Sequence, residues 1–188
     1  MSETIPKIYD FIQYNFIQYN MRNKNNYAFI DGNNLFLGTQ SEGWIINPSL
    51  LMDYLTNNLR VKKAFYFIGY IQQNINLYKS LRKAGFILIF KRTKKDNHNF
   101  IVENVDTDLV FHAMLKINNY YKAIVVSGDD DYYCLLKYLA YRKKLSRILI
   151  PCKKDCPKLF KKENLGIYLE YLLNKKDKLK YKDCPIKK

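Results

Sequence analysis

The sequence is poor in acidic residues. It has 17 Asp and Glu against 32 Lys and Arg in 188 residues, so the formal net charge is +15 at pH 7 and the pI is near 9.5. This surplus predicts a polyanionic partner, because neutralising phosphates with Lys and Arg releases counterions and drives nucleic-acid binding. An anionic membrane surface would also attract this positive charge, and it stays the alternative partner.

Long apolar runs are also missing. No stretch approaches the ~18 to 20 continuous apolar residues of a transmembrane helix, and the N-terminus MSETIPKIYD lacks the basic-then-apolar order of a secretory signal. We therefore expect a cytoplasmic protein that does not span a membrane. Its hydrophobic content of 48% suits one packed domain of this length.

Cysteine and histidine are too sparse for the common zinc and His-based sites. The four cysteines form neither two tight pairs nor a Cys pair followed by a His pair, so reduced thiols are expected instead of zinc. The only histidines, His98 and His112, are not near a Ser or Cys in a catalytic pattern. An acid–base mechanism through His is therefore less attractive than one that uses a metal-activated water.

Short apolar runs alternate with stretches of helical spacing. The runs are rich in Ile, Val, Phe and Tyr and have the length of strands buried on both faces. They cover residues 27–31, 62–70, 86–91, 122–128 and 147–151. Helical spacing covers residues 49–59, 74–84, 105–119 and 131–144. This alternation predicts βαβ crossovers, and hence a single α/β domain with a mostly parallel central sheet covered by helices on both faces.

Composition divides the chain into three parts. Residues 1–26 are polar and contain the duplication FIQYNFIQYN, which we interpret as an N-terminal helix or arm. The domain is expected over residues 27–173, with one short strand or helix near 166–173. Residues 174–188 are a Lys-rich tail, for which a solvated end and a binding role both stay open.

Aspartates follow or precede the predicted strands where a ligand would bind. Asp31 ends the run YAFID, residues 129–131 follow AIVVSG, and Asp106 and Asp108 open the helix before that second strand. In an open parallel sheet, ligands bind beyond the carboxyl ends of the strands, where the strand order reverses. A single helix-start Asp is most often a cap. Several carboxylates at one sheet edge need a cation, and oxygen ligands suit Mg²⁺ or Mn²⁺.

Three segments carry a family resemblance, in order along the chain. They are FIDGNNLFL (29–37), ENVDTDLVFHAM (103–114) and VVSGDDDYYCLL (125–136). These segments resemble the signature blocks of the NYN domain, the LabA-like branch of the PIN-like nuclease superfamily. The resemblance implies a PIN-like α/β/α sandwich and Mg²⁺- or Mn²⁺-dependent cleavage of RNA.

The resemblance also implies roles for single residues. Asp31 matches the acidic residue that ends the first strand, and Asn34 matches the polar residue of the family's Asp-x-x-Asn pattern. Asp106 matches the helix-start aspartate. Asp129 and Asp131 match the two aspartates of Ser-Gly-Asp-x-Asp-Phe/Tyr, with residue 130 in the variable place.

The leading hypothesis is a metal-dependent endoribonuclease. Asp31, Asp106 and Asp129 are expected to hold Mg²⁺ or Mn²⁺, directly or through waters. Asp131 and Asp108 are expected to support this shell, and Asn34 to orient a water or a phosphate oxygen.

Two departures from the family pattern favour a rival. Glu103-Asn104 stands where many members have Lys-Gly, and His112 stands where many have Asp six residues after the helix-start Asp. These departures leave open an RNA-binding module with little or no nuclease activity. A PIN-like nuclease of the flap type, acting on DNA, is a second rival.

Two other classes fit the residues less well. A phosphatase of the haloacid dehalogenase kind is disfavoured because no second aspartate follows two residues after Asp31. A membrane-surface protein would share the basic charge, and salt-sensitive binding to liposomes without binding to RNA would identify it. The resemblance implies RNA as the partner, and a homo-oligomer stays open.

The predicted substrate surface lies between Tyr54 and Lys95, where the chain has no Asp or Glu. An electropositive flank beside an acidic metal centre would steer a phosphate backbone to the metal. The candidates for backbone contact are Lys91, Arg92, Lys94 and Lys95. A solvated basic loop is the alternative for this segment.

Overall fold

The computed structural model describes residues 25–91, 93–95, 100–102, 105–154, 156–162 and 164–181, and side chains are described for all of these except 93–95, 100–102 and 162. A six-stranded sheet forms the centre, in the order β3-β2-β1-β6-β7-β8. Every neighbouring pair in it is parallel. Its strands are β1 (Asn26–Asp31), β2 (Val61–Gly69), β3 (Ile87–Lys91), β6 (Ala123–Val126), β7 (Leu145–Ile150) and β8 (Leu169–Tyr171).

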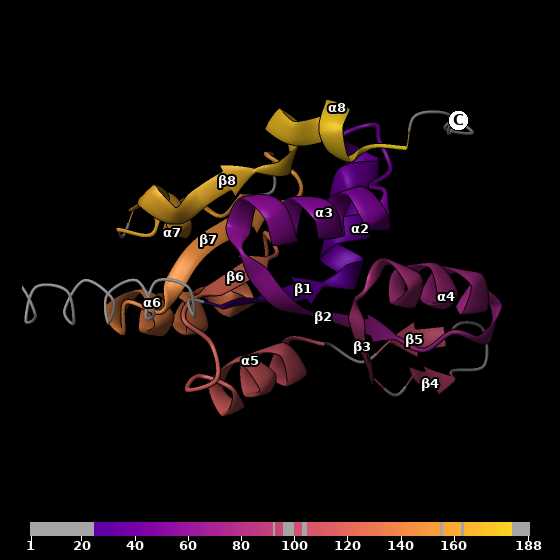
Figure 1. Ribbon diagram of the computed structural model, residues 1–188, viewed down its shortest axis with the longest axis horizontal. Coiled ribbons are helices and arrows are strands. Elements are labelled where there is room, and N and C mark those ends of the chain that lie inside the picture. The colour runs from indigo at the N-terminus through magenta and orange to yellow at the C-terminus, as the bar shows by residue number, and fades with distance from the viewer. Residues whose placement is uncertain are drawn as a thin grey trace, which may run out of the picture.

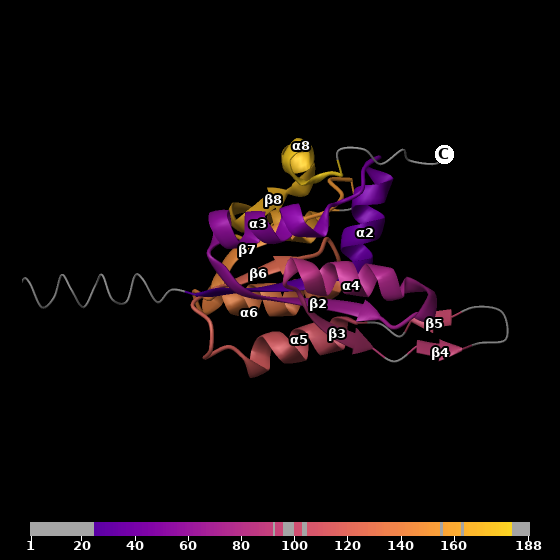
Figure 2. The same cartoon turned by 45° about the vertical axis from the view of Figure 1, so that its right-hand side comes forward.

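Helices cover both faces of this sheet (Figures 1 and 2). One face carries α2 (Gly32–Ser41), α3 (Pro48–Leu59), α4 (Ile75–Ala84) and α8 (Lys176–Leu179). The other face carries α5 (Asp106–Leu115) and α6 (Tyr133–Tyr141). The α/β fold with a mostly parallel central sheet is thus confirmed.

Short elements complete the chain. The strands β4 (Thr93–Lys95) and β5 (Phe100–Val102) form a separate antiparallel pair. A five-residue helix, α7 (Lys158–Lys162), precedes β8. The 3₁₀ turns are η1 (Gln72–Asn74), η2 (Asp130–Tyr132), η3 (Gly166–Tyr168) and η4 (Leu172–Lys175).

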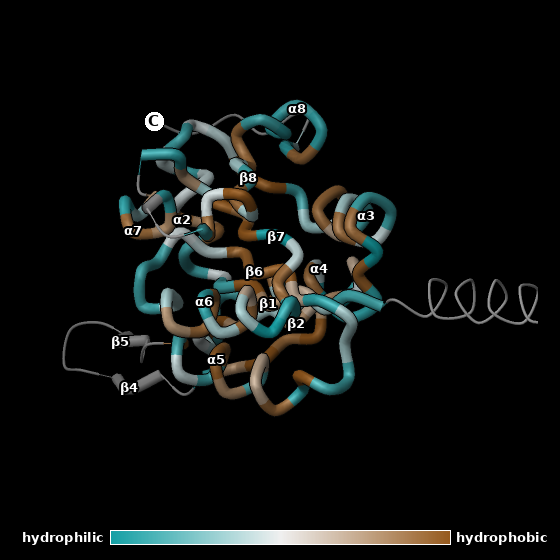
Figure 3. The backbone as a smooth tube through the Cα atoms, turned by 90° about the vertical axis from the view of Figure 1, so that its left-hand side faces the viewer, coloured by the Kyte–Doolittle hydropathy of each residue, from teal (hydrophilic) through white to brown (hydrophobic). Residues whose placement is uncertain are grey.

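The core lies on both sides of the central strands. All residues of β1 and β6 are buried. Along β1, Tyr27 and Phe29 pack with α5 and α6, whereas Ala28 and Ile30 pack with α2, α3 and α4. Figure 3 shows brown, hydrophobic strand segments in the middle of the molecule, between α3 and α5. Burial on both faces explains why these strands appear in the sequence as continuous apolar runs and not as alternating ones.

The strand order reverses between β1 and β6. From β1 the chain moves outward through β2 to β3, then returns to the other side of β1 and continues through β6 and β7 to β8. Because β1 and β6 are parallel neighbours, their carboxyl ends meet at the same edge of the sheet. This point is where a doubly wound α/β sheet forms its ligand site.

The helix α2 is absent from the sequence-based prediction, although it follows β1 directly. Its sequence, GNNLFLGTQS, contains two glycines and two asparagines, which are weak helix formers. Tertiary packing stabilises it instead, because Leu35 is fully buried against the sheet. The predicted helix over 105–119 is shorter, since α5 ends at Leu115.

The described part of the Lys-rich tail packs on the domain. Leu179 is 1% exposed, its carbonyl accepts a hydrogen bond from the Asn47 amide (2.8 Å), and the Tyr181 amide donates to the Ile45 carbonyl (3.2 Å). The fold therefore continues to Tyr181. Residues 1–24 of the expected N-terminal arm and residues 182–188 of the tail lie outside the described residues. Among the helices described, none is both long enough and apolar enough to span a bilayer.

Candidate metal centre

The carboxyl end of β1 turns directly into α2. Asp31 is 4% exposed, and its Oδ1 accepts a hydrogen bond from the Asn34 amide (2.9 Å), so it caps the helix. Glycine is required at the next position, because a Cβ on Gly32 would lie 2.4 Å from Tyr66 Cε1 and 2.8 Å from the Phe67 carbonyl oxygen. This close approach brings the start of α2 against β2.

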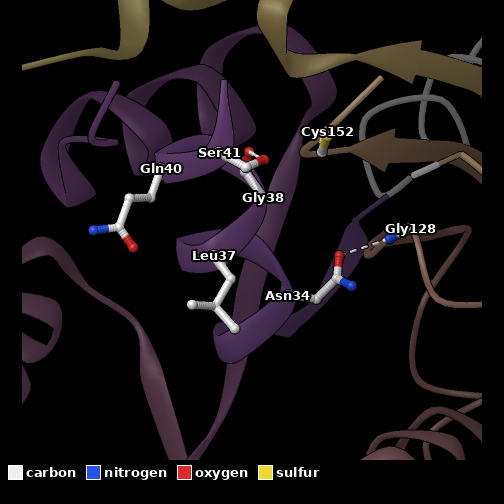
Figure 4. A pocket seen from close by; sticks show the side chains of 7 residues that line it. All are labelled: Asn34, Leu37, Gly38, Gln40, Ser41, Gly128 and Cys152. Carbon is white, nitrogen blue, oxygen red and sulfur yellow. Dashed lines mark hydrogen bonds between the residues drawn. The ribbon is translucent and has the colours of Figure 1, made fainter. Parts of the chain in front are cut away.

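Asn34 joins α2 to the loop after β6. Its Oδ1 accepts a hydrogen bond from the Gly128 amide (2.8 Å), drawn as a dashed line in Figure 4. The two residues are 94 positions apart in the chain. The side chain is therefore held at the edge where β1 and β6 end.

The loop after β6 is built from local hydrogen bonds. The buried Ser127 Oγ accepts from the Asp129 amide (3.1 Å). Asp129 Oδ1 in turn accepts from the Asp131 amide (3.0 Å) and caps η2. Because of these two bonds, Asp129 and Asp131 belong to one compact turn. Asp130 and Asp131 are both exposed, and Asp129 is half-buried.

Three carboxylates converge at this edge. Asp106, Asp129 and Asp131 each offer an oxygen, and these oxygens all lie within 4.8 Å of one another. Oxygens on opposite sides of an ion with bonds of about 2.0 to 2.6 Å are about 4 to 5 Å apart. The three carboxylates therefore have the chemistry and the spacing for one hard divalent cation such as Mg²⁺ or Mn²⁺.

Tyr132 links this cluster to Asp31. Its side chain is fully buried, and its hydroxyl contacts Asp31 Oδ2 (3.0 Å) and Asp106 Oδ1 at short range. The hydroxyl has one hydrogen and can donate it fully to only one carboxylate at a time. The sequence suggested Tyr132 as the packing aromatic of its motif or as a base-stacking ring, and it did not predict this contact. Its only signal is that the motif ends in Tyr and not Phe.

Burial and charge shift the protonation equilibria of this pair. Burial is the main cause that raises the pKa of Asp31, and the charges of Asp106 and Asp129 raise it further against the opposing hydrogen bonds from Asn34 and Tyr132. Burial, followed by the two neighbouring carboxylates, raises the pKa of Tyr132 well above its ordinary value. The phenol therefore stays protonated and the acidic cluster disfavours a further negative charge.

Asp108 and His112 lie apart from the three converging carboxylates. Asp108 has a 40% exposed side chain and pairs with Lys91 Nζ (3.6 Å). The His112 ring packs near Phe67, with 5.5 Å between ring centroids, and its buried Nδ1 has no hydrogen-bond partner among the described residues. Burial and then Lys116 lower the pKa of His112, which favours the neutral ring.

The predicted backbone-binding residues are only partly described. Arg92 lies outside the described residues, as do Glu103 and Asn104. Lys94 and Lys95 belong to β4, but their side chains are not described. The role of these residues in substrate binding stays a prediction. Lys91 ends β3 and is paired with Asp108.

An open pocket of about 470 Å³ lies between α2 and Gly128, the residue that precedes Asp129 in the chain (Figure 4). It is lined by residues from α2, by Gly128 and by Cys152. Cys152 Sγ donates to Glu42 Oε1 (3.4 Å), and the Lys153 amide donates to the same oxygen (3.0 Å). These contacts attach the end of α2 to the segment after β7, so one wall of the pocket is fixed.

Comparisons with known proteins bear on the family and the fold. The NYN domain family matches residues 27–163. The "Low amplitude and bright protein LabA" of Synechococcus elongatus is 26% identical over 114 residues, which are 55% of this chain and 61% of LabA. The chain thus spans about three fifths of the curated relative that it matches.

A solved structure shares the fold. It is a protein of unknown function from Vibrio parahaemolyticus, with a TM-score of 0.62, 13% sequence identity, and coverage of 84% of this chain and 97% of that one. NYN domains are in general nuclease-like and related to RNA, and this chain has an acidic cluster of Asp106, Asp129 and Asp131. Since the family match covers most of the chain, the protein belongs to the NYN domain family of the PIN-like superfamily.

Proposed function

We propose that the protein is a metal-dependent endoribonuclease that hydrolyses phosphodiester bonds of RNA at the cluster of Asp106, Asp129 and Asp131. The convergence of these three carboxylates within 4.8 Å, in a chain of net charge +15, is the observation that carries the proposal. Like charges this close repel unless a cation offsets them. A strongly basic protein attracts a polyanion, and a metal ion held at the acidic cluster would contact its phosphates.

The donor set suits Mg²⁺ or Mn²⁺, held by Asp106, Asp129 and Asp131. Such an ion activates a water and stabilises charge on a phosphodiester. Tyr132 orients Asp106 through its hydroxyl, and Asp31 holds Tyr132 from the other side. Asp31 is not one of the three carboxylates whose oxygens converge within 4.8 Å, and it accepts hydrogen bonds from Asn34 and Tyr132, so we assign Asp31 to positioning.

Asn34 is assigned to orient a water or a phosphate oxygen. Its carbonyl oxygen is occupied by the Gly128 amide, which leaves the amide nitrogen as the donor on the opposite side of the group. This nitrogen belongs to a side chain that also lines the open pocket between α2 and Gly128. A donor held in this way can bind a phosphate oxygen without first paying the entropy of ordering a free side chain.

One rival is favoured by a specific observation. His112 is packed among aromatic rings as a neutral group, and Asp108 is paired with Lys91, so neither extends the three-carboxylate cluster. A cluster that His112 and Asp108 do not extend offers fewer groups to hold metal ions, and this suits a domain that binds RNA with little turnover. The rival predicts RNA binding without cleavage that depends on a metal.

The test compares wild type with Asp129→Asn on a labelled single-stranded RNA, with Mn²⁺ or with EDTA. We expect cleavage by wild type with Mn²⁺, no cleavage with EDTA, and a loss of at least about a hundredfold in the variant. Asp130→Asn is the matched control, because it removes the adjacent carboxylate, which is exposed and outside the cluster. A DNA strand of the same sequence distinguishes RNA from DNA substrates.

Two results would overturn the proposal. Activity that is insensitive to EDTA and equal in wild type and Asp129→Asn would exclude the carboxylate cluster as the catalytic site. Tight RNA binding by the wild type, with no cleavage under any metal condition, would instead establish the RNA-binding rival.

A further inference from the structure

A surface on α6 combines basic and aromatic residues next to the metal centre. From Tyr132 to Lys154 the chain has no Asp or Glu but seven basic residues. The helix α6 begins at Tyr133, two residues after Asp131. Its buried face, which includes Leu135 and Leu139, packs on the sheet, so the opposite face is turned to solvent.

Cations lie beside aromatic rings along α6, where Tyr133 is half-buried against the core and Tyr138 and Tyr141 are exposed. Lys137 Nζ lies 5.5 Å from the Tyr133 ring centroid and donates to its hydroxyl (3.3 Å). On the neighbouring row, the Arg142 guanidinium lies 5.6 Å from the Tyr138 ring centroid and donates to its hydroxyl (2.7 Å). Tyr141 is 83% exposed. These pairs give α6 flat rings beside positive charges.

The far end of α6 borders a pocket of about 430 Å³. Buried Leu165 and half-buried Ala140 contribute to its lining, together with Lys137, Tyr141 and the exposed Ile167. Among the described residues, its lining contains no Asp or Glu. An apolar lining with a ring and an ammonium group suits a flat, uncharged base that is joined to a phosphate.

Tyr133, Lys137 and Tyr141 lie at four-residue spacing and follow one side of the helix. From Tyr133 to Tyr141 the helix rises about 12 Å. A strand lying on these residues therefore reaches from the pocket toward Asp131. We name Tyr133, Lys137, Tyr141 and the pocket the α6 track.

We propose that the α6 track binds a single strand of RNA, with bases against Tyr141 and in the pocket and the phosphate backbone against Lys137. The proposal rests on the proposed function, because it takes RNA to be the substrate that reaches the metal centre. Charge favours RNA over an apolar protein partner, since the track carries the Lys137 ammonium, Arg142 lies on the neighbouring row of α6, and the described residues of the track include no Asp or Glu. A single strand is favoured because its bases are free to stack on aromatic rings, whereas bases in a duplex are covered.

The test measures the anisotropy of a fluorescein-labelled 12-residue oligouridine, titrated with the full chain in EDTA so that no cleavage occurs. Tyr141→Ala is expected to weaken binding roughly tenfold, because it removes a stacking ring, and Tyr141→Phe is expected to bind like wild type. Affinity is also measured at several salt concentrations. Lys137→Gln is expected to reduce, by about one, the magnitude of the slope of log binding constant against log salt concentration. Phe111→Ala is the matched control, since Phe111 is a 59% exposed aromatic on α5.

Each outcome bears separately on the track and on the nuclease. If wild type cleaves RNA with Mn²⁺ but Tyr141→Ala and Lys137→Gln bind oligouridine like wild type, RNA binding on the α6 track is excluded and the proposed nuclease activity is supported. If the variants bind oligouridine weakly and wild type cleaves no RNA, RNA binding on the α6 track is supported and the proposed nuclease activity is excluded. If Tyr141→Ala weakens a hairpin duplex as much as oligouridine, or Tyr141→Phe binds as weakly as Tyr141→Ala, base stacking is excluded.

Discussion

The hydroxyl of Tyr132 donates a hydrogen bond to Asp31 Oδ2 over 3.0 Å, although the two residues are 101 positions apart in the chain. The same hydroxyl also contacts Asp106. The end of β1, the start of α5 and the turn after β6 therefore meet at one buried phenol. This contact links the carboxylate that caps α2 to the carboxylates that suit a metal.

Tyr132→Phe is expected to lower the free energy of unfolding by roughly 1 to 3 kcal/mol in EDTA, because two buried carboxylates lose their shared donor. Urea denaturation measures this change. Tyr133→Phe is the matched control, since the Tyr133 hydroxyl accepts from the exposed Lys137 (3.3 Å), and its effect is expected to stay within about 0.5 kcal/mol. Equal losses in the two variants would contradict a special role for the Tyr132 hydroxyl.

Asp131→Asn is expected to weaken Mn²⁺ binding at least roughly tenfold, as loss of a metal-site group does, whereas Asp108→Asn is expected to leave it unchanged. The reason is geometric: Asp131 lies in the cluster, while Asp108 pairs with Lys91. Calorimetric titration of Mn²⁺ into the metal-free protein measures both. A large loss in Asp108→Asn with none in Asp131→Asn would show that the cation binds elsewhere.

Asp31→Asn is expected to stabilise the metal-free protein at neutral pH. The folded state raises the pKa of Asp31 above its ordinary 3.8, so the native state holds this proton to a higher pH than the unfolded chain does. The wild type therefore loses stability as pH rises from 3.8 through the raised pKa, and the variant lacks this loss. The gain is expected to be largest at pH 7 and to shrink as pH falls toward 3.8.

Urea denaturation in EDTA at several pH values between 4 and 7 measures this dependence. Asp53→Asn is the control, because Asp53 is an exposed carboxylate on α3. A gain that grows as pH falls would have the wrong sign and would contradict the raised pKa.

Gly32→Ala is expected to destabilise the fold by roughly 1 to 3 kcal/mol. The added Cβ would lie 2.8 Å from the Phe67 carbonyl oxygen, a backbone atom that cannot rotate away. Gly166→Ala is the matched control, since its nearest neighbour would be at 3.8 Å, and we expect a small gain of about 0.4 to 1 kcal/mol or no change. Thermal unfolding of the two variants separates a steric clash from a general loss of glycine.

Much of the fold follows from local patterns in the sequence. The continuous apolar runs that became β1, β2, β6 and β7 are mostly buried, and that burial is what a continuous run indicates. The run that became β3 is only half-buried, because β3 lies at the edge of the sheet. The helix α2 could not be predicted in this way, because its Gly- and Asn-rich sequence is weak locally and depends on packing against the sheet. The same holds for α8, whose Leu179 is buried by contacts distant in sequence.

The sequence by itself determined the parallel α/β architecture and the placement of carboxylates just beyond β1 and β6, since both depend on the order and periodicity of neighbouring residues. Only the tertiary structure decided which carboxylates meet. The turn after β6 and the start of α5 bring Asp129 and Asp131 to Asp106, while Tyr132 takes the place next to Asp31. Side-chain direction at such a junction depends on how helices pack across the sheet, and a local pattern does not encode those distances.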